Sequence, residues 1–139
     1  MDDTTVCYEP IGVIHTDYSS GDDLPKQAAS AKNIAGRVEL REKYATGVTD
    51  LDDFSHIILL YHLDQISERA PLLTKPRDGD TEHGLFATRS PRRPNPIGFS
   101  VVRLDDVTGA MLTIAGVDML DGTPVLDIKP YVPEIDARE

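Results

Sequence analysis

Apolar and polar residues alternate with a period of two along several short stretches of this chain, which is the pattern of half-buried β-strands. The alternation is clearest at residues 36–41, where Val38 and Leu40 stand between charged residues. Residues 55–64 differ, because they contain a continuous apolar run that predicts a central strand covered on both faces. Further strands are predicted at residues 8–16, 97–107, 111–117 and 125–131.

Turn residues separate these predicted strands. Gly109-Ala110 predicts a tight turn between residues 97–107 and 111–117, which makes a hairpin of these two strands. Because the connections contain no long amphipathic helix, the sequence predicts an all-β, mainly antiparallel fold. We expect a small closed or nearly closed β-barrel with one or two short helices.

Other segments are predicted to be short or irregular. A helical turn is expected at residues 49–53, with Thr49 as its N-cap. The apolar run at residues 85–88 predicts a further short strand. Residues 69–82 have too few apolar positions to form an element and are predicted to be a long loop, and the tail at 132–139 is expected to be loose.

Length and composition indicate a single domain over residues 1–139. No apolar run approaches the roughly 20 residues of a membrane span, so no membrane partner is expected. The acidic start, Met1-Asp2-Asp3, is unlike a signal peptide, and we therefore expect a cytoplasmic protein. The single cysteine, Cys7, excludes an internal disulfide and is interpreted as a packed or edge thiol.

The net charge of −10 argues against a broad nucleic-acid-binding surface, which needs a basic footprint. Half of the 14 basic residues nevertheless lie between residues 69 and 103, so a local basic patch on an acidic body stays open. These residues are Arg69, Lys75, Arg77, Arg89, Arg92, Arg93 and Arg103. The acidic, lysine-poor composition also leads to the hypothesis that the protein is adapted to a cytoplasm of high salt concentration.

The most unusual stretch is residues 89–96, which contain three arginines and three prolines. Proline fixes φ, removes a donor and favours extended geometry in the preceding residue. Residues 90–96 are therefore predicted to form a stiff extended loop, neither helix nor central strand. Two interpretations stay open. The loop is either a binding loop that loses little entropy when a ligand arrives, or an ordinary surface connection with solvated arginines.

Candidate chemistry is found near the C-terminus, whereas no dinucleotide-binding or P-loop motif occurs. Residues 121–124 are either a plain hairpin turn or a ligand loop in which Asp121 accepts a hydrogen bond from a ribose or an amine. Asp127 and Lys129 share one face of the last strand, where they pair or the lysine serves a substrate. A single structural or ligand-contacting histidine is expected, and His62 is the best candidate. No partners for a metal-binding set are found, so no metal is predicted.

Two long motifs and three short ones follow one another along the chain. They are Ile11-Gly12-Val13-Ile14, Leu24-Pro25-Lys26-Gln27, Phe54-Ser55-His56, the run FATRSPRRPNPIG at residues 86–98, and the run DGTPVLDIKPY at residues 121–131. On these motifs the chain resembles the TsaA-like family, whose characterised members are the TrmO-type tRNA methyltransferases. The resemblance covers residues 8–133.

This resemblance implies a single TsaA-like β-barrel domain that uses S-adenosyl-L-methionine. It implies methylation of N6 in N6-threonylcarbamoyladenosine, next to the anticodon of certain tRNAs. It also implies a homodimer with its sites near the interface. Two alternatives are kept: a non-catalytic S-adenosylmethionine- or RNA-binding module of the same fold, and a methyltransferase that acts on another small nucleophile.

The family motifs also imply roles for residues of this chain. The implied cofactor contacts are Pro25, Lys26, Gln27, His62, Leu63, Arg89, Asp121, Gly122, Thr123 and Pro124. Lys26 departs from the arginine that family members often carry there. The implied RNA contacts are Arg92, Arg93, Asn95, Lys129 and Tyr131. For catalysis, the hypothesis is that Arg89 or Lys129 offsets the developing charge while Asp121 orients the cofactor.

Overall fold

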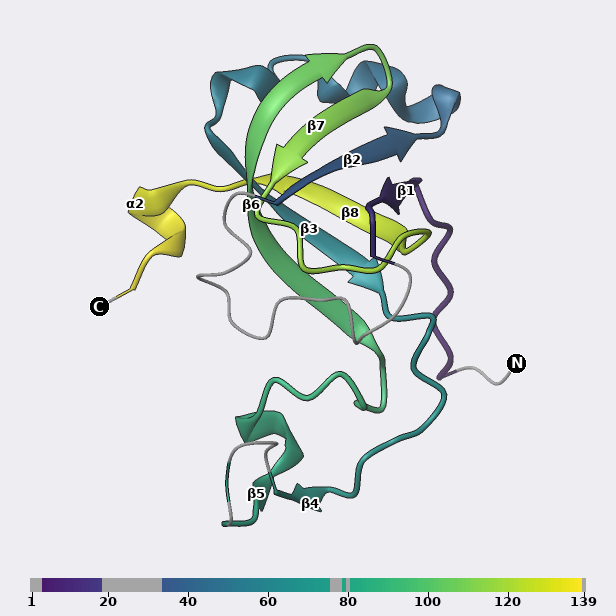
Figure 1. Ribbon diagram of the computed structural model, residues 1–139, viewed down its shortest axis with the longest axis vertical. Helices are drawn as coiled ribbons and strands as arrows, with labels where there is room; N and C mark the ends of the chain where they lie inside the picture. Colours follow the sequence, from purple (N-terminus) through teal and green to yellow (C-terminus); the bar gives the residue numbers. More distant parts are fainter. Residues whose placement is uncertain (1–3, 19–33, 76–78, 80, 139) are drawn as a thin grey trace.

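The computed structural model describes residues 4–18, 34–75, 79 and 81–138. Its main body is a closed antiparallel barrel of six strands in the order β1-β2-β7-β6-β3-β8 (Figure 1). The strands are β1 (Gly12–His15), β2 (Ala35–Leu40), β3 (His56–His62), β6 (Ile97–Thr108), β7 (Met111–Ala115) and β8 (Pro124–Pro130). The predicted all-β barrel is confirmed, and β6 and β7 form the predicted hairpin.

Apolar side chains that alternate along the strands fill the interior of the barrel. On β2, Val38 and Leu40 are buried, and Val38 lies opposite the buried Ile14 of β1. On β3, residues 57–59 are all buried, as the continuous apolar run predicted. Burial of each such side chain contributes about 1.5–3 kcal/mol relative to exposure, so the barrel is a stable frame for the polar groups at its ends.

Short 3-10 helices connect β2 to β3: η2 (Glu42–Val48) and η3 (Leu51–Asp53). The helical turn predicted at residues 49–53 is confirmed as η3, but the prediction of Thr49 as its N-cap is wrong. Thr49 ends η2 instead, and its Oγ1 donates to the carbonyl of Thr46 at 2.7 Å. Asp50 takes the cap position with φ 69°, a left-handed conformation that aspartate tolerates better than most residues.

An arm, defined as residues 65–96, leaves the barrel between β3 and β6 and extends away from it (Figure 1). It contains β4 (Leu73–Thr74), β5 (His83–Gly84) and the 3-10 helix η4 (Leu85–Ala87). The two-residue β4 corrects the prediction that residues 69–82 form only a loop. The strand predicted at residues 85–88 is wrong, because this run turns into η4 and Thr88 Oγ1 donates back to the carbonyl of Leu85 at 2.7 Å.

The remaining predictions for the arm and the termini have mixed outcomes. Residues 90–96 contain neither helix nor strand, as expected. The tail is less loose than predicted, since it forms α2 (Pro133–Asp136), where Asp136 Oδ2 accepts from the Val132 N–H at 2.8 Å. Cys7 is exposed, so of the two interpretations, a packed or an edge thiol, the packed one is wrong. Within the described residues, no helix is long and apolar enough to cross a membrane.

Candidate functional site

One end of the barrel, where β3 ends and β8 begins, carries His62, Leu63 and the 121–124 turn, and we call it the site end. There Tyr61 of β3 lies opposite Gly98 of β6 and Val125 of β8. A Cβ atom at position 98 would overlap the Tyr61 ring, so only glycine fits this close approach. Gly98 is the second residue of β6, so the strand passes directly against the tyrosine just after the proline-rich loop.

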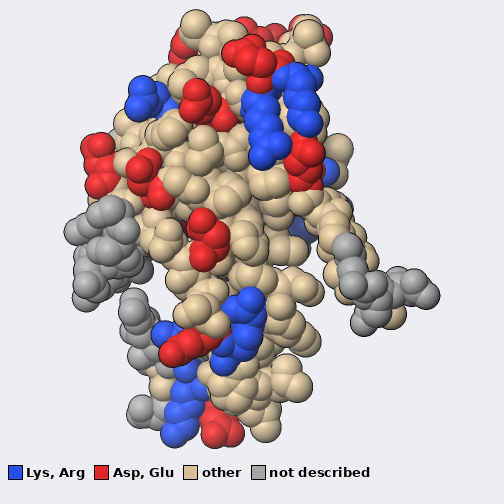
Figure 2. Space-filling view, turned by 90° about the vertical axis from the view of Figure 1, so that its right-hand side faces the viewer, with Lys and Arg blue, Asp and Glu red and all other residues tan. Residues whose placement is uncertain are grey.

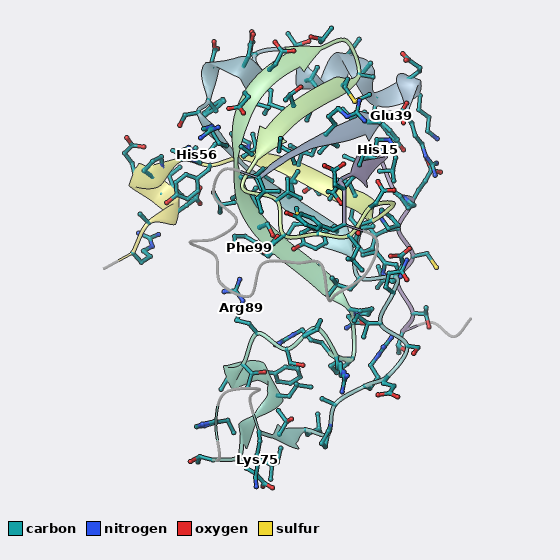
Figure 3. The ribbon with its side chains drawn as sticks, viewed as in Figure 1. His15, Glu39, His56, Lys75, Arg89 and Phe99 are labelled. Atoms are coloured by element: carbon teal, nitrogen blue, oxygen red, sulfur yellow. The ribbon has the colours of Figure 1, made fainter. Side chains whose placement is uncertain are left out.

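Arg89 reaches the site end from the arm. Its guanidinium carbon lies 5.9 Å from the centroid of the Phe99 ring, a cation–π distance (Figure 3). Phe99 is 49% exposed on the outer face of β6. The positive charge of Arg89 also acts to lower the pKa of Tyr61. Arg89 is thus an exposed cation beside an exposed aromatic ring at the site end.

A chain of hydrogen bonds connects the barrel interior to the surface at this end. The hydroxyls of Tyr61 and Ser100 lie 2.7 Å apart, and Ser100 Oγ donates to Asp118 Oδ1 at 3.0 Å. Burial raises the pKa of Tyr61 to about 12, and the negative charge of Asp118 adds to the rise. The hydrogen bond with Ser100 and the charge of Arg89 oppose the rise. Sequence reasoning missed Tyr61 and Ser100, because nothing in the pattern says that they meet.

The turn at residues 121–124 is tied to β1 through its backbone. The Asp121 N–H donates to the carbonyl of Tyr18 at 2.6 Å, and the Gly122 N–H donates to the carbonyl of Ile14 at 2.8 Å. Gly122 has φ 86°, where glycine is favoured. Asp121 Oδ1 accepts from the Thr16 N–H at 3.0 Å. The carboxylate of Asp121 therefore holds the turn in place.

His15 is a further polar side chain beside this turn that sequence reasoning did not select. Its Nε2 lies 2.9 Å from Glu39 Oε1 on β2, as Figure 3 illustrates, and its Nδ1 lies 3.7 Å from Asp121 Oδ1. His15 thus bridges a strand carboxylate and the carboxylate of the turn. The sequence could have indicated His15, because it alternates with the buried Ile14 along β1 and therefore lies on the outer face of that strand.

The other implied cofactor contacts lie beside the arm or outside the described residues. His62 is exposed at the last position of β3, and the Leu63 N–H donates to the carbonyl of Pro96 at 2.8 Å. This bond fixes the start of the arm against its end. Thr123 is buried, and its Oγ1 donates to the carbonyl of Leu120 at 2.7 Å. The predicted contacts at positions 25–27 lie outside the described residues.

Lys129 and Tyr131 do not join the site end within one chain. Lys129 lies opposite Ile58, and Tyr131 hydrogen-bonds through its N–H to the carbonyl of His56, at the other end of β3. Lys129 lies four positions after Val125 along β8, a rise of about 13 Å. Lys129 Nζ lies 3.0 Å from Asp127 Oδ2, so the two side chains pair, as one of the two open interpretations expected, and a role toward a substrate stays a prediction.

The arginines of the proline-rich loop differ in their surroundings. Arg93 Nη1 donates to the carbonyls of Thr88 and Ser90, at 2.7 and 3.1 Å, and its guanidinium lies 5.8 Å from the Phe86 ring centroid. Arg93 therefore braces the loop. Arg92 and Asn95 are exposed, and Arg92 faces Glu68 across 3.8 Å. The RNA contacts assigned to these residues stay predictions.

A groove and the acidic and histidine side chains elsewhere on the described part of the chain were compared with the site end. A groove of about 390 Å³ lies near η2 and η3, and its lining includes Tyr44, Leu51 and Ile128 but none of the predicted site residues. Among the described residues, no group of three or more His, Cys, Asp or Glu side chains is arranged to hold a metal ion.

The fold and the site together define a small β-barrel protein with a polar site at one end of the barrel. The chain belongs to the family described as the tRNA-methyltransferase O N-terminal domain, whose model matches residues 13–137. The family resemblance seen in the sequence motifs is therefore confirmed. A protein of Archaeoglobus fulgidus named S-adenosyl-L-methionine-binding protein is 40% identical over 128 residues, which cover 92% of this chain and 91% of that protein.

Longer relatives match over part of their length. The tRNA (adenine(37)-N6)-methyltransferase of Escherichia coli is 40% identical over 135 residues, which cover 91% of this chain and 57% of that protein. The crystal structure of TrmO from Pseudomonas aeruginosa superposes with a TM-score of 0.83 at 37% identity, covering 99% of this chain and 60% of that chain. This chain therefore spans somewhat more than half the length of these two relatives.

Proposed function

We propose that this protein binds S-adenosyl-L-methionine at the site end and transfers its methyl group to N6 of N6-threonylcarbamoyladenosine in tRNA. The observation that carries the proposal is the arrangement at one end of the barrel, in a chain of this family: Arg89 lies against Phe99, His62 pairs with Ile97, and the 121–124 turn leads into Val125, opposite Tyr61. These residues come from three separate segments, so the fold itself assembles the set.

The chemistry of the site end fits the cofactor. S-Adenosylmethionine presents a carboxylate, an ammonium, a sulfonium and an adenosine. Arg89 supplies donors for a carboxylate or a hydroxyl, and the exposed Phe99 ring supplies an apolar face for a purine. The backbone of the 121–124 turn supplies polar groups for the ribose. When bound, the cofactor supplies an electrophilic methyl group, and the protein's part is to position it.

The arm is the part of the chain suited to RNA. By sequence it carries six basic and four acidic residues, whereas the rest of the chain carries eight basic and twenty acidic residues. Figure 2 shows a group of Lys and Arg side chains on the arm, below a barrel with many acidic side chains. Phosphate binding is a local electrostatic effect, so a basic arm attracts tRNA in spite of the negative total.

Assembly as a homodimer is part of the same proposal. Ile97, Phe99 and Val101 alternate on the outer face of β6 and are 47%, 49% and 39% exposed. Leu72 and Phe86 on the arm are 68% and 72% exposed. Exposed apolar side chains that cluster in this way mark interaction surfaces, and the β6 stripe adjoins the site end.

Calorimetric titration of S-adenosylmethionine into the purified protein tests the proposed binding, with Arg89→Ala as the site variant. Arg103→Ala is the matched control, because Arg103 lies further along β6 and pairs with Asp105. We expect loss of binding in Arg89→Ala only. Nucleoside mass spectrometry of tRNA incubated with protein and cofactor then tests the transfer. Absence of cofactor binding in the wild type would refute the proposal.

A non-catalytic S-adenosylmethionine-binding module is the second candidate function. It is favoured by the name of the A. fulgidus relative, which this chain covers over nearly its whole length, and by the acidic barrel. Cofactor binding without methylation of any tRNA would decide for this candidate. Methylation of a free small nucleophile would instead indicate the other alternative, a methyltransferase that acts on a small molecule.

A further inference from the structure

The hydrogen-bonded chain at the site end has a defined direction. Ser100 has one hydroxyl proton, and it donates that proton to Asp118 Oδ1 at 3.0 Å. The bond between Tyr61 and Ser100 must therefore run from the tyrosine hydroxyl to the serine oxygen. The hydrogen-bonded chain delivers its bond to one oxygen of the Asp118 carboxylate, and no side-chain donor among the described residues bonds the second oxygen.

The barrel interior does not need these polar groups for packing. Tyr61 and Ser100 are 6% and 8% exposed, in strands whose other inward positions are apolar. Buried hydroxyls cost free energy unless they are hydrogen-bonded, and an apolar pair of similar shape is nearly neutral in comparison. We therefore interpret the hydrogen bonds of Tyr61 and Ser100 as a means of orienting the carboxylate of the exposed Asp118.

Asp118 lies among the groups assigned to the proposed cofactor site. Asp118 accepts from Ser100 at 3.0 Å, and the preceding residue of β6, Phe99, lies 5.9 Å from the guanidinium of Arg89. The 121–124 turn follows Asp118 after two residues. Asp121 in that turn directs its carboxylate toward β1, which leaves Asp118 as the carboxylate oriented by the buried chain.

We propose that Asp118 is the proton acceptor of the methyl transfer and that Ser100 and Tyr61 are positioning residues that hold it. This proposal rests on the proposed function. In the step, the N6 lone pair of the modified adenosine forms the new N–CH₃ bond. The S–CH₃ electron pair stays on sulfur, which becomes a neutral thioether. The N6 proton goes to the free oxygen of the Asp118 carboxylate, and no further reactant is needed.

The first experiment compares Asp118→Asn with Asp52→Asn, a control at an exposed aspartate in η3. Single-turnover methylation of tRNA is measured at saturating cofactor as a function of pH. General-base catalysis contributes about 100-fold or more, so we expect a loss of that size in Asp118→Asn with unchanged cofactor affinity. We also expect the acid limb of the wild-type pH profile to disappear. Asp52→Asn should behave as the wild type.

Two results of this experiment would overturn the proposal. A wild-type-like rate in Asp118→Asn would show that the carboxylate accepts no proton. A large loss of cofactor affinity in Asp118→Asn would make Asp118 a cofactor contact instead. A wild type that binds cofactor but methylates no tRNA overturns both this inference and the proposed function, whereas a fully active Asp118→Asn overturns this inference alone.

A second experiment tests the hydrogen bonds from Tyr61 through Ser100 to Asp118 without the methyl-transfer reaction. Tyrosinate absorbance after a pH jump measures the pKa of Tyr61, with Tyr61→Phe to identify its transition. Since the negative charge of Asp118 raises the pKa of Tyr61, Asp118→Asn should lower that pKa. A Tyr61 transition that does not move in Asp118→Asn would show that the chain does not form in solution, and the inference would fail.

Discussion

Gly98 and Tyr61 face each other across β6 and β3 so closely that a Cβ atom on residue 98 would overlap the tyrosine ring. Gly98→Ala should therefore destabilise the barrel by about 1–3 kcal/mol, as over-packing does in other cores. Urea unfolding measures the change. Gly47→Ala is the control, because a Cβ atom there has no neighbour within 4 Å. Equal stability of the two variants would contradict the close approach.

Ser100→Ala should cost more stability than Tyr61→Phe. The serine substitution leaves the buried Tyr61 hydroxyl without its partner, a cost of about 1–3 kcal/mol, whereas the tyrosine substitution removes one donor and leaves Ser100 bonded to Asp118. The double variant should lose less than the sum of the single losses, since no orphaned hydroxyl remains. Strict additivity in the double-mutant cycle would mean that the two hydroxyls do not interact.

Asp121→Ala should weaken S-adenosylmethionine binding, while Asp121→Asn should largely keep it. Both substitutions remove the negative charge that faces His15, but asparagine retains an oxygen that accepts from the Thr16 N–H. Comparing the two variants therefore distinguishes the effect of the turn's shape on cofactor binding from the effect of the Asp121 charge. Calorimetric titration measures the affinities. If asparagine is as damaging as alanine, the charge of Asp121 acts on the cofactor directly.

Glu9→Gln should make the protein less sensitive to mild acid. The hydrogen bond from Lys43 is the main cause that lowers the pKa of Glu9 in the folded protein below its ordinary 4.5, followed by the hydrogen bond from Tyr44. A lowered folded pKa gives stability that is present above 4.5 and is lost as the pH falls through the folded value.

Thermal unfolding of the wild type and Glu9→Gln at several pH values measures this effect. The difference between them should be largest above 4.5 and vanish in acid. It should be small and should shrink in high salt, because the group is exposed. Glu42→Gln, in the first turn of η2, is the control. A difference between wild type and Glu9→Gln that does not change with pH would rule out the ion pair as its source.

Arg92→Ala should lower the salt dependence of tRNA binding. If Arg92 contacts one phosphate, the slope of log affinity against log salt should fall by about 0.9 in magnitude. Lys129→Ala discriminates between two surfaces, since Lys129 lies away from the arm and pairs with Asp127. An unchanged slope in Lys129→Ala confines the RNA surface to the arm, and a reduced slope extends it to β8.

The sequence allowed the barrel and the local shape of the site to be predicted to a large extent. The alternation at residues 36–41 and the apolar run at 57–61 report directly which faces are buried, because that pattern has the period of a strand. The prolines of residues 90–96 excluded helix and strand through their own covalent geometry. These properties depend on neighbours in the chain, so they are readable without a fold.

Properties that depend on distant partners could not be predicted in this way. The run at 85–88 has the composition of a strand, but its first N–H bonds to the carbonyl of Leu72 and the run then closes into η4. Threonine is a residue type favoured at N-caps, yet Thr49 lies at the C-terminal end of η2. In each case, a hydrogen-bond partner outside the local pattern decided the conformation.

The sequence by itself determined the strand pattern, the stiff arginine–proline loop, the turn at residues 121–124 and the family. Only the tertiary structure decided which polar groups meet. It joined Tyr61, Ser100 and Asp118 into one chain across three segments, and the register of β8 against β3 placed Lys129 opposite Ile58 instead of Tyr61. The reason is physical: register and barrel closure fix distances between residues far apart in sequence, and no local preference encodes those distances.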